Sequence, residues 1–136
     1  MRAWIGIAGI AALAGCVNKA DTSVEAGARA FADNCAACHG VDGRGSGSFG
    51  RQLITQPPDL TTLSARNGGV FPRDEVASTI DGYARGAHFS AAMPEFGAGD
   101  MGPTVIVENA DGTATPIPAE LLALVTYLEA IQRDPG

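Results

Sequence analysis

Apolar residues recur at helical spacing near both ends of the chain. In residues 119–132 (AELLALVTYLEAIQ) the large apolar side chains fall on one face of a helix with 3.6 residues per turn. They are Leu121, Leu124, Val125, Leu128 and Ile131. Residues 24 to about 36 are alanine-rich, and Gly27, Phe31 and Cys35 are spaced four apart and so share a face. The pattern predicts two long helices.

Short polar motifs predict where the helices begin and end. Thr22-x-x-Glu25 is typical of a capping box, so we expect the first helix to begin after Thr22. Shorter helices are predicted over residues 60–66 and 72–81, because Asn-Gly-Gly follows the first and Gly82 follows the second. A proline opens the second of these segments, in keeping with the preference for proline at a first turn.

Two further segments are not helical. Residues 104–117 alternate β-branched and polar side chains on either side of Asn-Ala-Asp-Gly, which predicts a small β-hairpin. Residues 40–58 are rich in Gly, Ser and Pro and predict a loop, in which GRGSGSFG (43–50) is typical of a flexible surface loop. No Gly-Lys-Ser/Thr follows the glycines, so this loop is not a phosphate cradle. We therefore expect an all-α domain with an inserted hairpin.

The first 16 residues, MRAWIGIAGIAALAGC, are typical of a secretory signal, since one positive residue precedes a short apolar run and small residues. Two cleavage sites fit. Cleavage after Ala14 would leave Cys16 as a stray thiol, whereas Leu13-Ala14-Gly15-Cys16 resembles a bacterial lipobox, in which Cys16 is acylated. We favour the lipobox because an unpaired thiol is otherwise unexplained. The expected organisation is a signal over residues 1–15, a tether over 16–23 and a domain over 24–136.

The mature chain is acidic. Loss of residues 1–15 leaves eight Lys and Arg against 15 Asp and Glu, a formal charge of −7. This charge argues against binding to nucleic acid and against electrostatic binding to anionic lipid. It suits docking to a basic patch on a partner protein. Solubility outside the cytoplasm would account for the same charge.

The two remaining cysteines lie in one pentapeptide, Cys35-Ala-Ala-Cys38-His39. A structural zinc ion needs about four protein ligands, and the chain has no second Cys-x-x-Cys pair. A thioredoxin-like redox pair usually follows a strand, but here a helix is predicted before it. Covalent haem attachment fits each part: two thiols join the vinyl groups and the adjacent imidazole binds the iron. Export fits too, because bacterial c-type haem is attached outside the cytoplasm.

From this motif outward the chain resembles the class I cytochrome c family, over roughly residues 24–132. GARAFADNC looks like the family's N-terminal helix running into its haem motif. LVTYLE looks like its C-terminal helix, with Leu124 and Tyr127 placed to cross Gly27 and Phe31. The resemblance implies a cytochrome c fold, with helices around one haem c.

The resemblance also implies how the haem iron is held. Pro57-Pro58-Asp59-Leu60 looks like the family's Pro-x-Leu loop. The Pro58 carbonyl would accept a hydrogen bond from the free ring nitrogen of His39, and Leu60 would pack on the haem face.

Three residues are candidates for the second axial ligand. Met93-Pro94 resembles the family's Met-Pro ligand loop, so Met93 is the leading candidate. Met101 and His88 are the alternatives. The propionates have four possible partners, none of them preferred: Arg51, Arg66, Arg73 and Tyr83.

Ligation by His39 and Met93 would leave no vacancy on iron, and this implies an electron carrier rather than an enzyme. We expect it to shuttle single electrons between redox partner proteins on the periplasmic side of a bacterial membrane, either lipid-anchored or soluble. Two alternatives stay open. The protein could be the haem subunit of a periplasmic dehydrogenase, or a haem enzyme or gas sensor with a displaceable methionine.

Overall fold

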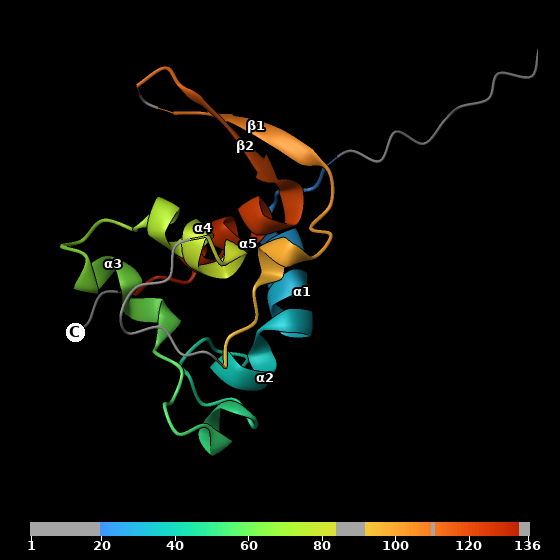
Figure 1. The fold of residues 1–136 in the computed structure, drawn as a ribbon. Helices are drawn as coiled ribbons and strands as arrows, with labels where there is room; N and C mark the ends of the chain where they lie inside the picture. Colours follow the sequence, from blue (N-terminus) through green and yellow to red (C-terminus); the bar gives the residue numbers. More distant parts are fainter. Residues whose placement is uncertain (1–19, 84–91, 110, 134–136) are drawn as a thin grey trace, which may run out of the picture.

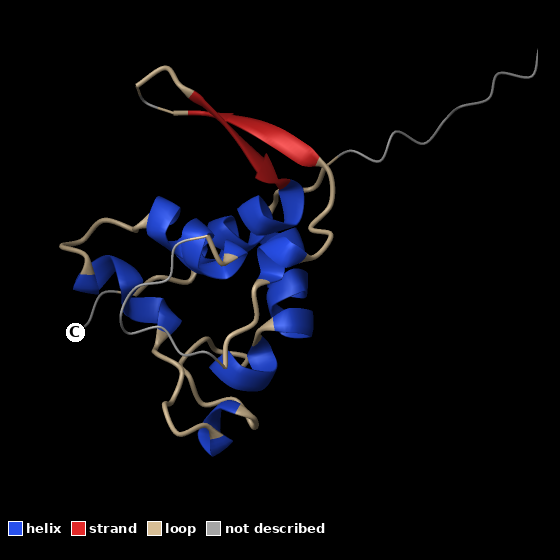
Figure 2. Cartoon of the chain, in the orientation of Figure 1, coloured by secondary structure: helices blue, strands red, loops and turns tan. Residues whose placement is uncertain are grey.

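The computed structural model describes residues 20–83, 92–109 and 111–133, and these form a helical domain that carries one β-hairpin (Figures 1 and 2). The predicted signal, its cleavage site, Cys16 and His88 lie outside the described residues. The helices are α1 (Val24–Asn34), α2 (Ala36–His39), α3 (Leu63–Arg66), α4 (Arg73–Asp81) and α5 (Ala119–Ala130). Three short 3-10 helices are η1 (Gly50–Gln52), η2 (Leu60–Thr62) and η3 (Phe96–Ala98). No helix of the described residues is long and apolar enough to cross a bilayer.

Helices α1 and α5 cross in close contact, as the sequence predicts, and Gly27 makes this possible. A Cβ atom at Gly27 would lie 2.0 Å from the carbonyl oxygen of Ala123 and 2.7 Å from Cβ of Tyr127. One turn further along α1, the rings of Phe31 and Tyr127 pack with centroids 5.3 Å apart. The expected crossing is therefore confirmed, with glycine as the residue that lets the two backbones approach.

The start of α1 differs from the prediction by one residue. Ser23, not Thr22, is the N-cap, and its Oγ accepts a hydrogen bond of 3.2 Å from the Ala26 N–H. Asp21 in turn accepts one from the Ser23 N–H. With Ser23 as cap, Glu25 sits at the second helical position instead of the third. The predicted capping box is therefore wrong, because its carboxylate is out of register.

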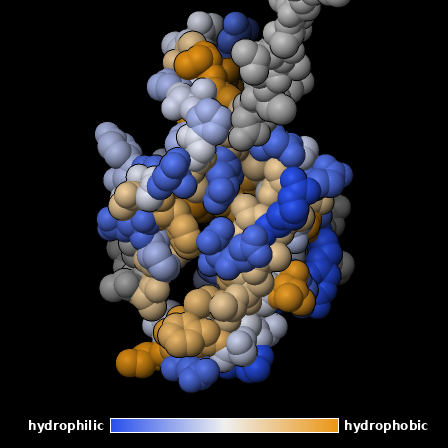
Figure 3. All heavy atoms as spheres, turned by 90° about the vertical axis from the view of Figure 1, so that its right-hand side faces the viewer, coloured by the Kyte–Doolittle hydropathy of each residue, from blue (hydrophilic) through white to orange (hydrophobic). Residues whose placement is uncertain are grey.

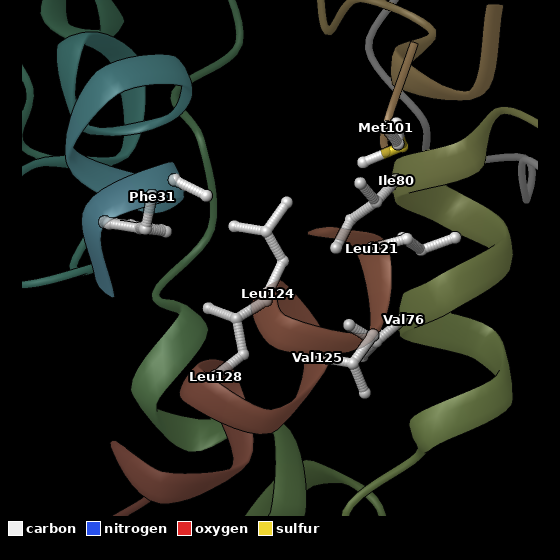
Figure 4. Packing of buried hydrophobic residues seen from close by; sticks show 9 residues of the cluster. Phe31, Val76, Ile80, Met101, Leu121, Leu124, Val125 and Leu128 are labelled. Atoms are coloured by element: carbon white, nitrogen blue, oxygen red, sulfur yellow. The ribbon is translucent and has the colours of Figure 1, made fainter. Parts of the chain in front are cut away.

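The core lies between α1, α4 and α5 (Figure 4). Nine buried residues form it: Ala30, Phe31, Val76, Ile80, Met101, Leu121, Leu124, Val125 and Leu128. The predicted helix over residues 60–66 is present in two pieces, η2 and then α3. The predicted helix that stops at Gly82 is α4, with Gly82 in the left-handed conformation and Pro72 as its N-cap.

The predicted hairpin is present as β1 (Thr104–Glu108) and β2 (Ala114–Pro118), paired antiparallel from Thr104↔Pro118 to Glu108↔Ala114. It projects from the helical body, and β2 runs directly into α5 (Figure 1). Ile117 packs against the core, whereas Ile106 is 64% exposed. Apolar side chains gather on the hairpin at the top of Figure 3 and again towards the lower end of the same face.

Candidate functional site

The two cysteines lie on one helical turn at the end of α1. Cys35 caps α1 and its carbonyl accepts hydrogen bonds from the N–H groups of Cys38 and His39. Both thiols are half-buried and neither is in a disulfide. Burial, and then the nearby Cys38 and Glu120, raise the pKa of the Cys35 thiol to about 11. Reactive Cys-x-x-Cys pairs have lowered pKa values, so this environment does not favour thiol redox chemistry.

The glycine-rich loop packs directly on this motif, and the prediction of a flexible surface loop is wrong for this part of it. Gly47 and Gly50 are buried, and a Cβ at Gly50 would lie 2.1 Å from the Cys38 carbonyl oxygen. The Phe49 N–H donates to the Ala37 carbonyl at 2.9 Å. Glycine is needed here because the loop backbone lies against the backbone of the motif with no room for side chains.

His39 is half-buried, and its Nδ1 is buried with no hydrogen bond of normal geometry to any described residue. Burial lowers the pKa of the imidazole, while the Pro58 carbonyl acts in the opposite direction. The Pro58 carbonyl therefore lies close enough to act on the His39 ring, which is the pairing that the resemblance implies, but no hydrogen bond joins the two among the described residues. A buried imidazole that is kept neutral is suited to bind a metal ion.

A cavity of about 660 Å³ opens beside these residues. This volume lies within the range of about 300–1,000 Å³ that is usual for cofactor sites. Cys35, Cys38, His39, Pro58 and Leu60 all line it. Much of the rest of the wall is apolar: Phe31, Leu53, Leu63, Val76, Ile80, Phe96, Leu124 and Leu128. Two thiols, one imidazole and an apolar wall fit a covalently attached haem.

Met93 lines this same cavity and is half-buried. Met101 does not line it: its side chain is only 6% exposed and belongs to the core cluster. Its carbonyl accepts a hydrogen bond from Glu120 at the start of α5. Met93 therefore lines the same cavity as Cys35, Cys38 and His39. Met101 instead packs in the hydrophobic core.

The four possible propionate partners differ in whether they line the cavity. Arg66 lines the cavity. Arg73 forms an ion pair with Glu129, and Arg51 donates to the Ser46 carbonyl. Tyr83 is 88% exposed and is not among the residues that line the cavity. Arg66 is therefore the candidate with direct access to a group in the cavity.

Several lining residues were not identified from the sequence as site residues. Val76 and Ile80 lie four apart on α4, and this spacing could have marked a buried helical face. Phe96 follows shortly after Met93, and the sequence around it gives no periodic signal. These residues add apolar side chains to the wall of the cavity.

Fold and site together define a protein that holds one haem c within a small helical domain. The family model described as Cytochrome c matches residues 24–132, so the chain belongs to the cytochrome c family. No curated protein and no solved structure matches the chain. The family membership confirms covalent haem c as the cofactor, with Cys35 and Cys38 as its attachment pair. When bound, the haem supplies a one-electron ferric–ferrous couple.

Proposed function

We propose that this protein is a mono-haem electron carrier in which His39 and Met93 are the two axial ligands of the iron. The observation that carries the proposal is that Met93 lines the same cavity as Cys35, Cys38 and His39. A thioether opposite an imidazole raises the reduction potential, and it suits a protein that accepts and returns single electrons.

A carrier follows from this ligand set because both axial positions are then filled by the protein. No substrate has access to the iron unless Met93 leaves. The protein's part is to exclude water, hold the imidazole and thioether, and keep the ligands alike in both oxidation states. The apolar wall of Leu60, Leu124 and Leu128 suits the first of these tasks.

The partners and the location are part of the same proposal. Redox partner proteins are implied by the family, and the charge of −7 on the mature chain favours partners with a basic docking patch. Acylation of Cys16 would hold the domain at the periplasmic side of a bacterial membrane. Cleavage after Ala14 would instead release a soluble periplasmic carrier.

The test is a spectroscopic redox titration of the haem-loaded protein combined with carbon monoxide binding. A carrier gives one reversible one-electron step, and its ferrous form binds carbon monoxide slowly because Met93 must leave first. Immediate binding of carbon monoxide would overturn the proposal and indicate an open iron, as in a haem enzyme or gas sensor.

A further inference from the structure

The C-terminal end of α5 holds the segment that follows Pro58, through the side chain of Gln132. Its Nε2 donates to the Leu60 carbonyl at 2.8 Å and to the Leu128 carbonyl at 2.7 Å. Its Oε1 accepts a hydrogen bond of 2.9 Å from the Ser64 N–H. One side chain therefore joins α5 to both ends of the short stretch that contains η2.

A second set of hydrogen bonds reinforces this attachment. Thr61 is 2% exposed, and its hydroxyl donates to Asp59 Oδ1 at 2.6 Å. The Arg133 N–H donates to the Thr61 carbonyl at 2.8 Å, and Arg133 Nη2 donates to the Thr61 hydroxyl at 3.2 Å. Residues 59–64 are thus fixed to the helix end by both backbone and side-chain bonds.

The other side of the Pro-Pro segment is fixed as well. The Leu60 N–H donates to the Gly43 carbonyl at 2.8 Å. A Cβ at Gly45 would lie 2.1 Å from the Pro57 carbonyl oxygen, so the two backbones are in contact. Pro58 therefore lies between the glycine-rich loop and the segment that Gln132 holds. Its carbonyl, which acts on the His39 ring, therefore has a fixed neighbour on each side.

We propose that Gln132 is a positioning residue for the iron ligand His39, acting through Leu60 and the Pro58 carbonyl. The inference rests on His39 as ligand, as proposed above. A carbonyl held at the imidazole Nδ1–H makes the other ring nitrogen a stronger donor to iron. Loss of Gln132 removes the bonds to the Leu60 carbonyl and the Ser64 N–H, so the segment next to Pro58 is held less firmly and that donation weakens. A weaker donor stabilises ferric iron less, so the reduction potential rises.

The test compares Gln132→Met with Gln52→Met in the haem-loaded protein. Both changes replace an amide by an isosteric apolar side chain, and the Gln52 amide also donates to a backbone carbonyl, that of Ser48. Gln52 does not line the cavity. The readouts are the midpoint potential and the solvent exchange rate of the His39 Nδ1 proton, followed by NMR in the ferrous state.

We expect Gln132→Met to raise the midpoint potential, and with it the ferrous-to-ferric ratio at a fixed applied potential, and to speed the exchange of the Nδ1 proton. Gln52→Met should change neither. Unchanged values for Gln132→Met, even with a lower melting temperature, would reduce Gln132 to a purely structural residue and overturn the inference. If Gln132→Met does not retain haem, Thr61→Val is judged by the same two readouts.

The two proposals fail in different ways. If Met93 is not a ligand, Met93→Ala keeps the potential of the parent, and the Gln132 comparison still reports on His39. If Gln132 does not position His39, the Met93 result stands and the two glutamine variants behave alike.

Discussion

One local turn occurs twice among the residues that the structure describes, once beside the haem cavity and once at the tip of the hairpin. In the first, Asp59 Oδ1 accepts hydrogen bonds from the Thr61 N–H at 2.8 Å and from its hydroxyl at 2.6 Å. In the second, Asp111 Oδ1 accepts the same pair from Thr113 at 2.9 and 2.6 Å. The local chemistry of the two turns is the same.

Their surroundings differ completely. Thr61 is buried and bound by Arg133, whereas Asp111 and Thr113 are exposed. The first turn ends the Pro-Pro segment that faces His39, and the second closes a hairpin that projects from the body (Figure 1). The hydrogen bonds within an Asp-x-Thr turn therefore fix the local backbone and no more than that. Its importance to the site comes from what packs on it.

The largest effect is expected from removal of the haem. Cys35→Ala/Cys38→Ala should leave the protein largely unfolded, because the cavity of about 660 Å³ then has no occupant. The apolar side chains that line it would then face water, and full burial of one such side chain is worth about 1.5–3 kcal/mol. Small domains have a stability of about 5–15 kcal/mol in total. Circular dichroism measures the loss, and a variant as helical and as cooperative as the parent would refute this account of the cavity.

A smaller but still large effect is expected at the helix crossing. Gly27→Ala places a methyl group 2.0 Å from the Ala123 carbonyl oxygen and forces α1 and α5 apart. Overpacking of this kind costs about 1–3 kcal/mol. The control is Gly99→Ala, where the nearest atom would be 3.4 Å away. Urea unfolding of the haem-loaded variants should show a loss for Gly27→Ala alone, and equal losses would contradict the close crossing.

The two turns can be compared directly by substitution. Asp59→Ala removes the acceptor of a buried hydroxyl, and an unsatisfied buried group costs about 1–3 kcal/mol. Asp111→Ala removes the same bonds at an exposed site and should leave the stability close to that of the parent. Thermal unfolding of both variants tests the comparison. An equal loss of stability in Asp111→Ala and Asp59→Ala would contradict the difference between the two turns.

The smallest effect concerns pH. The hydrogen bond from the Thr61 hydroxyl is the main reason why the pKa of Asp59 is held below its ordinary value of 3.8. A lowered folded-state pKa means that the charged form stabilises the fold above about pH 3.8 and that this contribution is lost as the pH falls through the folded-state pKa. Asp59→Asn should therefore be less stable than the parent at pH 7 and approach it as the pH falls below 3.8, by urea unfolding. A gap that widens in acid would contradict the shift.

Much of the fold could be predicted because its signals are local. The apolar face of α5, the β-branched strands on either side of an Asn-Ala-Asp-Gly turn and the Cys-x-x-Cys-His motif are all contained within about 15 residues. The N-cap was missed by one position, because Thr22 and Ser23 have equivalent hydroxyls and only the backbone decides between them. Haem c as the cofactor was predicted from five residues and is confirmed by the family membership.

The contacts that hold the site residues in place could not be predicted, since they join residues far apart in the sequence. Gln132 and Leu60 are 72 residues apart, and no pattern in the sequence links them. The glycine-rich loop was interpreted as flexible because glycine and serine are typical of such loops. In this chain Gly47 and Gly50 are needed because another backbone lies against them. Met101 illustrates the same limit: the sequence ranks it below Met93, but its place in the core is visible only in the structure.

The most direct test of the central claim is a redox titration of Met93→Ala and Met101→Ala beside the haem-loaded parent. If Met93 is the ligand, the potential of Met93→Ala falls sharply, because the thioether that raises it is gone. Met101→Ala should keep the parent potential and lose only stability, since its side chain is part of the core. A potential that falls in Met101→Ala and is unchanged in Met93→Ala would contradict the account.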